Sequence, residues 1–101
     1  MKRHGEIITS YLWKNFRISV EIDESGWEGV LLHQEEIDQA LIPEEKLAGL
    51  PDPLLFHMTT YEDEKGSEWL FALASHPDDV HQLYYATCIL NDEFYTSWIP
   101  N

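Results

Sequence analysis

Residues 54–75 read LLFHMTTYEDEKGSEWLFALAS, and this stretch decides the fold class. Two arms rich in apolar and aromatic residues, 54–61 and 68–74, flank the polar segment EDEKGS. Arms of this length and composition are typical of β-strands, and Gly66 can adopt the backbone geometry of a tight turn. The stretch therefore predicts a β-hairpin, which is the basic unit of an antiparallel sheet.

A second hairpin is predicted upstream, at residues 7–22, where apolar and polar positions mostly alternate. The positions that share one side are odd-numbered before Lys14 and Asn15 and even-numbered after them, as expected when two residues form a hairpin turn. A competing interpretation makes residues 6–14 a short helix, because apolar residues also recur there at a spacing of four. We expect the hairpin, with the helix as the alternative for its first arm.

The remaining segments predict one more strand on each side of the central hairpin and two helical segments. Residues 27–34 are expected to form a strand after the turn DESG, and 93–99 a closing edge strand. Residues 34–50 change to helical spacing and end at the segment PDP. Apolar positions over 78–90 recur at three and four, which favours a helix, although LYYATCIL contains enough aromatic and branched residues for a strand.

These elements predict a single α+β domain over residues 1–101. Its expected architecture is an antiparallel sheet of five or six strands covered by two helical segments. A chain of 101 residues is too short for two ordinary domains. The residues expected in the core are Trp69, Phe71, Leu73, Val20, Ile18, Leu83 and Tyr84.

The chain is strongly acidic, with 19 Asp and Glu against 6 Lys and Arg and a formal net charge of −13. Most of the basic residues precede residue 20, so the rest of the chain is almost entirely acidic. Direct binding to nucleic acid is therefore not expected, because phosphates are repelled, whereas a basic protein is attracted. The alternative is that the charge only keeps a small protein soluble.

Cysteine content and hydropathy indicate a soluble, cytoplasmic protein. Cys88 is the only cysteine, so no internal disulfide is possible, and its apolar neighbours suggest a packing role. The N-terminal stretch lacks the apolar run of a signal peptide. No window approaches the roughly 18 apolar residues of a membrane span.

The stretch SHPDDVH, residues 75–81, contains the side chains that can hold a catalytic zinc. It resembles the His-Pro-Asp-Asp-Glu signature of zinc-dependent N-acetylglucosaminyl deacetylases. The resemblance implies His76 and Asp79 as zinc ligands and Asp78 as general base. This chain departs from the family at Val80, where the family has Glu, and its last histidine is His81, so a downstream histidine ligand is missing.

The same residues also suit the beginning of a helix. Pro77 fits a first helical position, and the two aspartates after it favour the positive end of a helix dipole. We expect this structural role, no cofactor and no bound metal, and we find no other catalytic constellation: no phosphate-binding glycine loop is present.

Three acidic clusters are the candidate partner-binding residues, together with one tryptophan that is expected either to anchor a partner or to pack in the core. Each cluster is alternatively a solvated loop or helix face. The candidate residues are Asp23, Glu24, Trp27, Glu28, Glu35, Glu36, Asp38, Glu44, Glu45, Glu62, Asp63, Glu64 and Glu68.

The charge pattern predicts a small stoichiometric inhibitor that occupies the basic surface of a nuclease or another nucleic-acid-handling protein. In size and charge the chain is similar to immunity proteins against nuclease toxins and to phage-encoded inhibitors of DNA-binding defence complexes, in the manner of a nucleic-acid mimic. Two alternatives remain open at this stage. One is a metal-dependent hydrolase built on His76 and Asp79, and the other is a subunit whose acidity serves only solubility.

Overall fold

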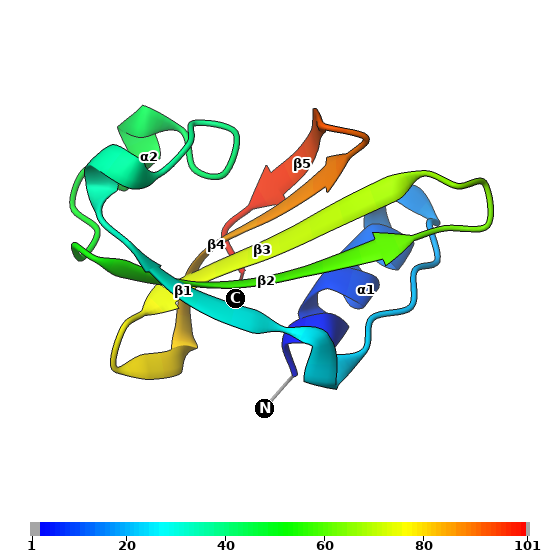
Figure 1. Ribbon diagram of the computed structural model, residues 1–101, viewed down its shortest axis with the longest axis horizontal. Helices are drawn as coiled ribbons and strands as arrows, with labels where there is room; N and C mark the ends of the chain where they lie inside the picture. The colour runs from blue at the N-terminus through cyan, green and yellow to red at the C-terminus, as the bar shows by residue number, and fades with distance from the viewer. Residues whose placement is uncertain (1–2, 101) are drawn as a thin grey trace.

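The computed structural model describes residues 3–100 and is built on a five-stranded antiparallel sheet with its strands in chain order (Figure 1). The strands are β1 (Glu28–Leu32), β2 (Leu54–Glu62), β3 (Glu68–His76), β4 (Asp79–Leu90) and β5 (Glu93–Trp98). The helices are α1 (His4–Phe16) and the short α2 (Glu44–Leu47), with single 3-10 turns at η1 (Glu24–Gly26) and η2 (Gln34–Glu36). The fold is α+β with one five-stranded sheet, as the sequence predicts.

The β2–β3 hairpin forms where the sequence predicts it. Its last pair joins Glu62 and Glu68, which face each other across the loop. The carboxylate of Asp63 closes the loop by accepting a hydrogen bond of 2.9 Å from the backbone N–H of Ser67. Gly66 has a φ of 79°, a conformation that costs glycine little and other residues much more. Loop chemistry and strand composition therefore specify this element together.

Strand β3 lies at the centre of the sheet, and both of its faces are covered. Trp69, Phe71 and Leu73 lie on one face, where they pack against Ile8 and Leu12 of α1. These two helix residues are four positions apart, so they lie on the same side of α1, and both are fully buried. Burial of these side chains holds α1 against the sheet.

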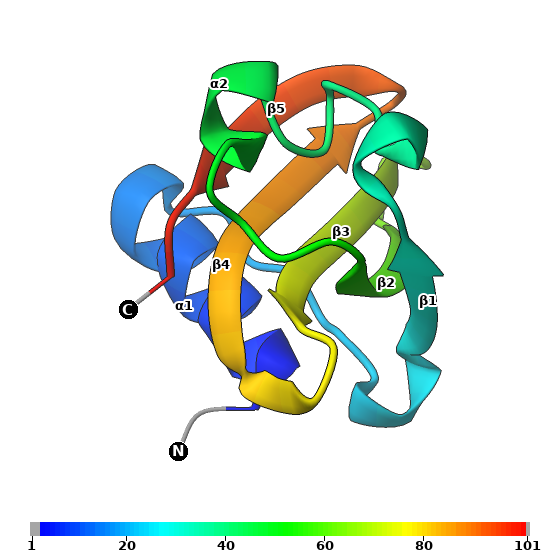
Figure 2. The same ribbon diagram turned by 90° about the vertical axis from the view of Figure 1, so that its left-hand side faces the viewer.

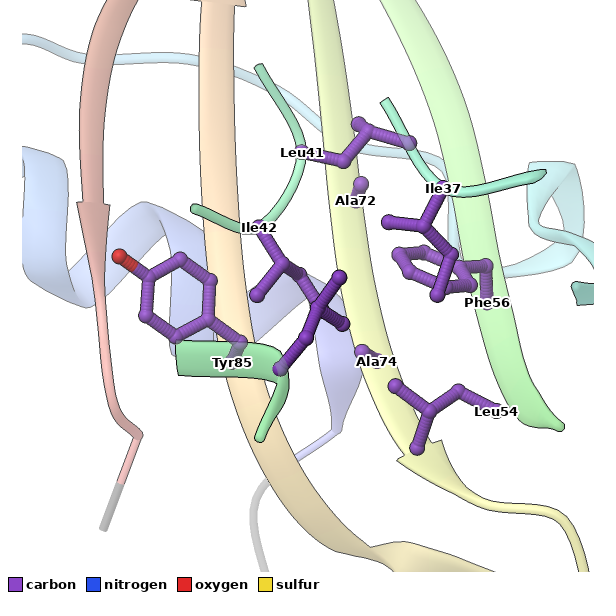
Figure 3. Packing of buried hydrophobic residues seen from close by; sticks show 9 residues of the cluster. Ile37, Leu41, Ile42, Leu54, Phe56, Ala72, Ala74 and Tyr85 are labelled. Carbon is purple, nitrogen blue, oxygen red and sulfur yellow. The ribbon is translucent and has the colours of Figure 1, made fainter. Parts of the chain in front are cut away.

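The opposite face of the sheet is covered by residues 37–47 (Figures 2 and 3). The hydroxyl of Thr87 on β4 donates a hydrogen bond of 2.6 Å to the carbonyl oxygen of Leu41, which ties this segment to the sheet. The buried residues of this layer and of the sheet beneath it are Ile37, Leu41, Ile42, Leu47, Leu54, Phe56, Ala72, Ala74 and Tyr85. The helical segment predicted at 34–50 therefore exists as short turns rather than as one continuous helix.

The predicted N-terminal hairpin is wrong, and the competing helix is correct. Residues 4–16 form α1, and Lys14 and Asn15 belong to its last turn rather than to a β-turn. The helix ends at Arg17, whose φ of 56° is left-handed. The N–H of Arg17 donates to the carbonyl oxygen of Trp13, and the N–H of Ile18 donates to that of Leu12. The spacing of four between buried residues was the correct signal, because one side of this segment contacts the sheet.

Residues 16–22 do not form the predicted strand. Residues 17–23 belong to no helix or strand and are not part of the sheet. Val20 is buried and Ile18 and Ile22 are partly buried against the α1 face of the sheet. The alternation therefore arises from a segment that packs one side against the core, which needs no ladder of hydrogen bonds.

The predicted helix at 78–90 is also wrong, because these residues form strand β4. Pro77 and Asp78 form the turn of a tight hairpin between β3 and β4, so Pro77 does not begin a helix. Tyr85 faces the 37–47 layer while Ala86 and Cys88 face α1. Residues 85–88 are buried on both faces of the sheet, and a strand segment of this kind loses the period-two pattern, so its apolar run resembles that of a helix.

The other predictions agree with the structure more closely. The strand expected at 27–34 is β1, and the strand expected at 93–99 is β5. Among the predicted core residues, four are buried and three are only partly buried. The buried ones are Val20, Trp69, Phe71 and Leu73, and the partly buried ones are Ile18, Leu83 and Tyr84.

Candidate functional site

The stretch that resembles the deacetylase signature is a hairpin turn. His76 and Asp79 are the last paired residues of β3 and β4. The ring Nδ1 of His76 accepts a hydrogen bond of 3.0 Å from the backbone N–H of Asp78, and the Asp79 carboxylate accepts one of 3.0 Å from the N–H of His81. These side chains satisfy the backbone of the turn, which explains their presence without any reaction.

The turn does not fit a catalytic zinc ion. Such a site needs three protein ligands and an open position. Within residues 3–100 no three histidine, cysteine or carboxylate side chains are grouped so that they could hold a metal ion. His76 and Asp79 have no third ligand beside them, so we derive no step through zinc or through Asp78.

The first acidic cluster lies at η1 and the beginning of β1. Asp23 accepts hydrogen bonds from the hydroxyl and the backbone N–H of Ser25, at 2.7 and 2.9 Å, and these bonds hold the pKa of its carboxyl below the usual value. The carboxylate of Glu24 lies against Gly5 in the first turn of α1, near the positive end of the helix dipole. Glu28 is exposed at the beginning of β1. Asp23 and Glu24 thus have local structural roles.

Trp27 is partly buried against the α1 face of the sheet rather than projecting into solvent. The ring of His4 lies edge-on to it, with centroids 5.7 Å apart. Its indole N–H is buried and has no hydrogen-bond partner in the described part of the chain. The Trp27 side chain therefore packs in the interior. Of the two roles expected for it, packing in the core agrees with the structure better than anchoring a partner.

The second acidic cluster is divided between two short turns on the opposite face. Glu35 and Glu36 belong to η2, where the Glu36 carboxylate accepts a hydrogen bond of 2.9 Å from the backbone N–H of His33. Glu44 and Glu45 occupy the first turn of α2. All four of these glutamates are exposed to solvent.

The third cluster borders a hollow of about 620 Å³ on the 37–47 side of the sheet. Four carboxylate residues, Asp38, Glu62, Glu68 and Asp92, surround it, and none of the Lys and Arg residues that the structure describes lines it. We call this feature the acidic hollow. Its other lining residues are Ala40, Thr60, Tyr61, Trp69, Leu70 and Ile89. The fold thus brings Asp38, from the second predicted cluster, to two residues of the third.

Asp92 was missed by the sequence analysis. It lies in the two-residue turn between β4 and β5, where Asn91 and Asp92 have φ of 49° and 64°. The side-chain oxygen of Asn91 accepts a hydrogen bond of 2.9 Å from the backbone N–H of Glu68, which holds this turn beside the beginning of β3. An Asn-Asp pair between two strand-like segments is the signal that would have located it.

Asp63 and Glu64 lie at the tip of the β2–β3 hairpin, beside the hollow. Asp63 accepts a hydrogen bond from the backbone N–H of Ser67, and this bond lowers the pKa of its carboxyl. Its second oxygen accepts a hydrogen bond of 3.2 Å from the indole N–H of Trp69. The negative charge at the tip is therefore fixed in position, while Glu64 is exposed.

In the described part of the chain no salt bridge to Lys or Arg neutralises the carboxylates of this region, and Lys65 at the hairpin tip makes only the smallest contribution to the lowered pKa of Asp63. Within residues 3–100 the single salt bridge joins His33 and Asp52, whose side-chain atoms are 3.0 Å apart. Arg3, Lys14 and Arg17 lie on α1 or at its ends, on the other side of the sheet from the acidic hollow. Lys46 on α2 and Lys65 at the tip of the β2–β3 hairpin do not line the hollow either, so within residues 3–100 no Lys or Arg side chain stands among its carboxylates.

Three histidines that are distant in sequence meet at the beginning of α1. The His4 ring centroid lies 4.4 Å from that of His57 and 6.5 Å from that of His81. The His57 Nε2 and the Ser75 hydroxyl share a hydrogen bond of 2.9 Å, and the hydroxyl also lies 3.2 Å from the carbonyl oxygen of His76. Burial, together with the charge of His4, lowers the pKa of His57 to about 4.

Cys88 is fully buried in β4, and burial raises the pKa of its thiol to about 12. A thiol with so high a pKa is not an activated nucleophile. This agrees with the packing role expected from its apolar neighbours.

Within residues 3–100 no helix has the length and hydrophobicity needed to cross a bilayer. The chain matches no protein-family model, and comparison with curated proteins and with solved structures finds no significant match.

Proposed function

We propose that this protein is a small neutralising partner, whose acidic hollow binds the basic surface of a nucleic-acid-handling protein and blocks it. One observation carries the proposal: four carboxylates surround a concave surface that no Lys or Arg among residues 3–100 lines. A cavity lined by carboxylates can accept the cationic side chains with which such proteins bind phosphate.

The electrostatics support association with a basic partner. The formal net charge is −13, and the single salt bridge of the described residues involves a histidine rather than Lys or Arg. A partner surface built for phosphate supplies the missing positive charge. Complementary fields of this strength raise the association rate to about 10⁸–10⁹ M⁻¹s⁻¹ at low ionic strength.

The proposed class is inhibitory rather than enzymatic, comparable with immunity proteins or with phage-encoded inhibitors of defence complexes. We place the encounter in the cytoplasm, since a chain with one cysteine suits a reducing compartment. Direct binding to nucleic acid is not part of the proposal, because phosphates are repelled by the same carboxylates.

A capture experiment with two charge-matched variants tests the proposal. The first variant neutralises the acidic hollow with Asp38→Asn, Glu62→Gln, Glu68→Gln and Asp92→Asn. The amide introduced by Asp38→Asn keeps an oxygen for the Ala40 N–H, which Asp38 binds at 2.8 Å, and asparagine tolerates the positive φ of residue 92. The second carries Glu6→Gln, Glu28→Gln, Glu35→Gln and Glu45→Gln, which are exposed positions that do not line the hollow.

We expect the wild-type protein and the second variant to retain nucleic-acid-binding proteins from host extract, and duplex DNA to release them in competition. The hollow variant should retain few or none. Equal loss in both variants would show that net charge alone governs retention. Retention that duplex DNA does not affect would contradict a phosphate-binding target.

A further inference from the structure

Three large aromatic side chains are exposed at the end of α1 and on β5. Trp13, Phe16 and Tyr95 are 52%, 43% and 37% exposed, and the rings of Phe16 and Tyr95 are 5.4 Å apart. Trp13 and Phe16 are three positions apart on α1 and therefore lie on neighbouring parts of its surface. We call these three residues the aromatic patch. Grouped exposed rings of this size mark contact surfaces more often than single exposed residues do.

A chain of contacts connects the aromatic patch to the acidic end of the sheet. Tyr95 lies edge-on to Trp69, with ring centroids 5.3 Å apart, and the Trp69 indole N–H donates to Asp63 at the hairpin tip. Asp92 and Glu93 enter β5 only two or three residues before Tyr95. The patch therefore has carboxylates along one side, and these belong to or adjoin the acidic hollow.

The charge beside the aromatic patch indicates which kind of molecule can bind there. Two copies of this chain, which each carry a formal charge of −13, repel each other, and this disfavours a symmetric dimer through the patch. Phosphates of nucleic acid and anionic lipid headgroups are repelled in the same way. The α1 side of the patch carries Lys14 and Arg17, whose guanidinium lies over the Trp13 ring at 5.4 Å, so the acidic side of the patch is the one next to Tyr95 on β5. A basic protein is the occupant that both the rings and the carboxylates suit.

We infer that the aromatic patch is the apolar anchor of the interface with the basic partner, while the acidic hollow steers the encounter. This inference rests on the proposed function and adds the residues that hold the complex together. Exposed ion pairs contribute little to affinity, whereas buried aromatic side chains dominate the energetics of most interfaces. The partner should therefore present an apolar depression bordered by Lys and Arg.

Site-specific photo-crosslinking in producing cells tests the inference. Phe16 is replaced by p-benzoylphenylalanine in one strain, Glu68 in a second and Leu31, an exposed apolar residue of β1, in a third. The protein crosslinked from positions 16 and 68 is identified and purified, and its kinetics are measured with two double variants. Phe16→Ala with Tyr95→Ala should raise the dissociation rate on the order of tenfold or more and leave the association rate within about twofold. Val30→Ala with Leu31→Ala is the control and should change neither rate.

Each outcome decides the inference. A basic protein crosslinked from positions 16 and 68, with faster dissociation of the patch variant, supports it. A basic protein crosslinked from position 68 alone, or a patch variant with unchanged dissociation, overturns the anchor and leaves the proposed function standing. A second copy of this chain crosslinked from position 16 also overturns it. No basic protein crosslinked from either position overturns both, and unchanged thermal melting of the variants shows that they are folded.

Discussion

At the scale of single residues, the same side chains serve backbone turns and chemistry, and sequence alone did not separate the two. His76, Asp78 and Asp79 resemble a zinc signature, yet they close a hairpin through hydrogen bonds of 3.0 Å. The proximity of His4, His57 and His81 could not be predicted, because α1, β2 and β4 bring them together from distant positions. Local motifs were visible in the sequence, whereas their spatial partners were not.

His57 provides a prediction about stability in acid. Its folded pKa of about 4 is below the ordinary 6.5, so the unfolded chain binds more protons between these values. Its contribution to stability is fully present above pH 6.5 and is lost as the pH falls toward 4. After allowance for solvent screening the loss is on the order of 1–2 kcal/mol. Urea unfolding at several pH values measures it.

The His57→Gln variant should show a shallower fall in unfolding free energy over the same pH interval. His81→Gln, at an exposed position in the same cluster, is the control and should keep most of the wild-type slope. The carboxyls of Asp23 and Asp63 do not interfere, because their pKa values are lowered below 3.8. Identical slopes in wild type and His57→Gln would contradict the role assigned to this histidine.

At the scale of elements, the hairpin of β2 and β3 was predictable because strand composition and turn chemistry agree. The errors at 7–22 and 78–90 have one cause: each segment's pattern reflects what covers it, and the covering element was unknown. Residues 17–23 alternate without sheet pairing, and residues 85–88 of β4 lack alternation because both faces of the strand are buried there. The segment at 37–47 covers a face although its only α-helix is four residues long.

A substitution at Thr87 tests how the segment at 37–47 is held on the sheet. Thr87→Val keeps the shape of the side chain but leaves the carbonyl oxygen of Leu41 without the hydroxyl donor. We expect a loss of about 1–3 kcal/mol in the free energy of unfolding, measured by urea denaturation. Thr60→Val, an exposed change on β2, should cost less than about 0.5 kcal/mol. Equal effects of the two changes would contradict the tether.

At the scale of the whole molecule, the sequence predicted the charge imbalance but not its arrangement. Two carboxylates of the acidic hollow come from a predicted cluster at one hairpin, and the other two, Asp38 and Asp92, come from separate turns. Trp27, the expected anchor, is partly buried, while exposed rings lie at the end of α1 and on β5. Composition indicates the kind of partner, and the fold determines which carboxylates meet.

Unneutralised charge should also make stability depend on salt. Raising NaCl from about 0.02 to 0.5 M screens repulsion among the carboxylates, so the melting temperature should rise. A gain of about 1 kcal/mol corresponds to a shift of about 4–8 °C for a chain of this size. The hollow variant should show a smaller rise. A melting temperature that falls with salt would mean that favourable ion pairs dominate the surface.

The most direct test of the central claim is the association rate with the purified basic partner as a function of ionic strength. If the acidic hollow steers binding, the rate falls steeply as salt increases, and the slope is reduced in the Asp38→Asn, Glu62→Gln, Glu68→Gln, Asp92→Asn variant. The variant with the same net charge but substitutions at Glu6, Glu28, Glu35 and Glu45 should keep most of the wild-type slope. A rate that does not depend on salt, or equal slopes in the two variants, would contradict the claim.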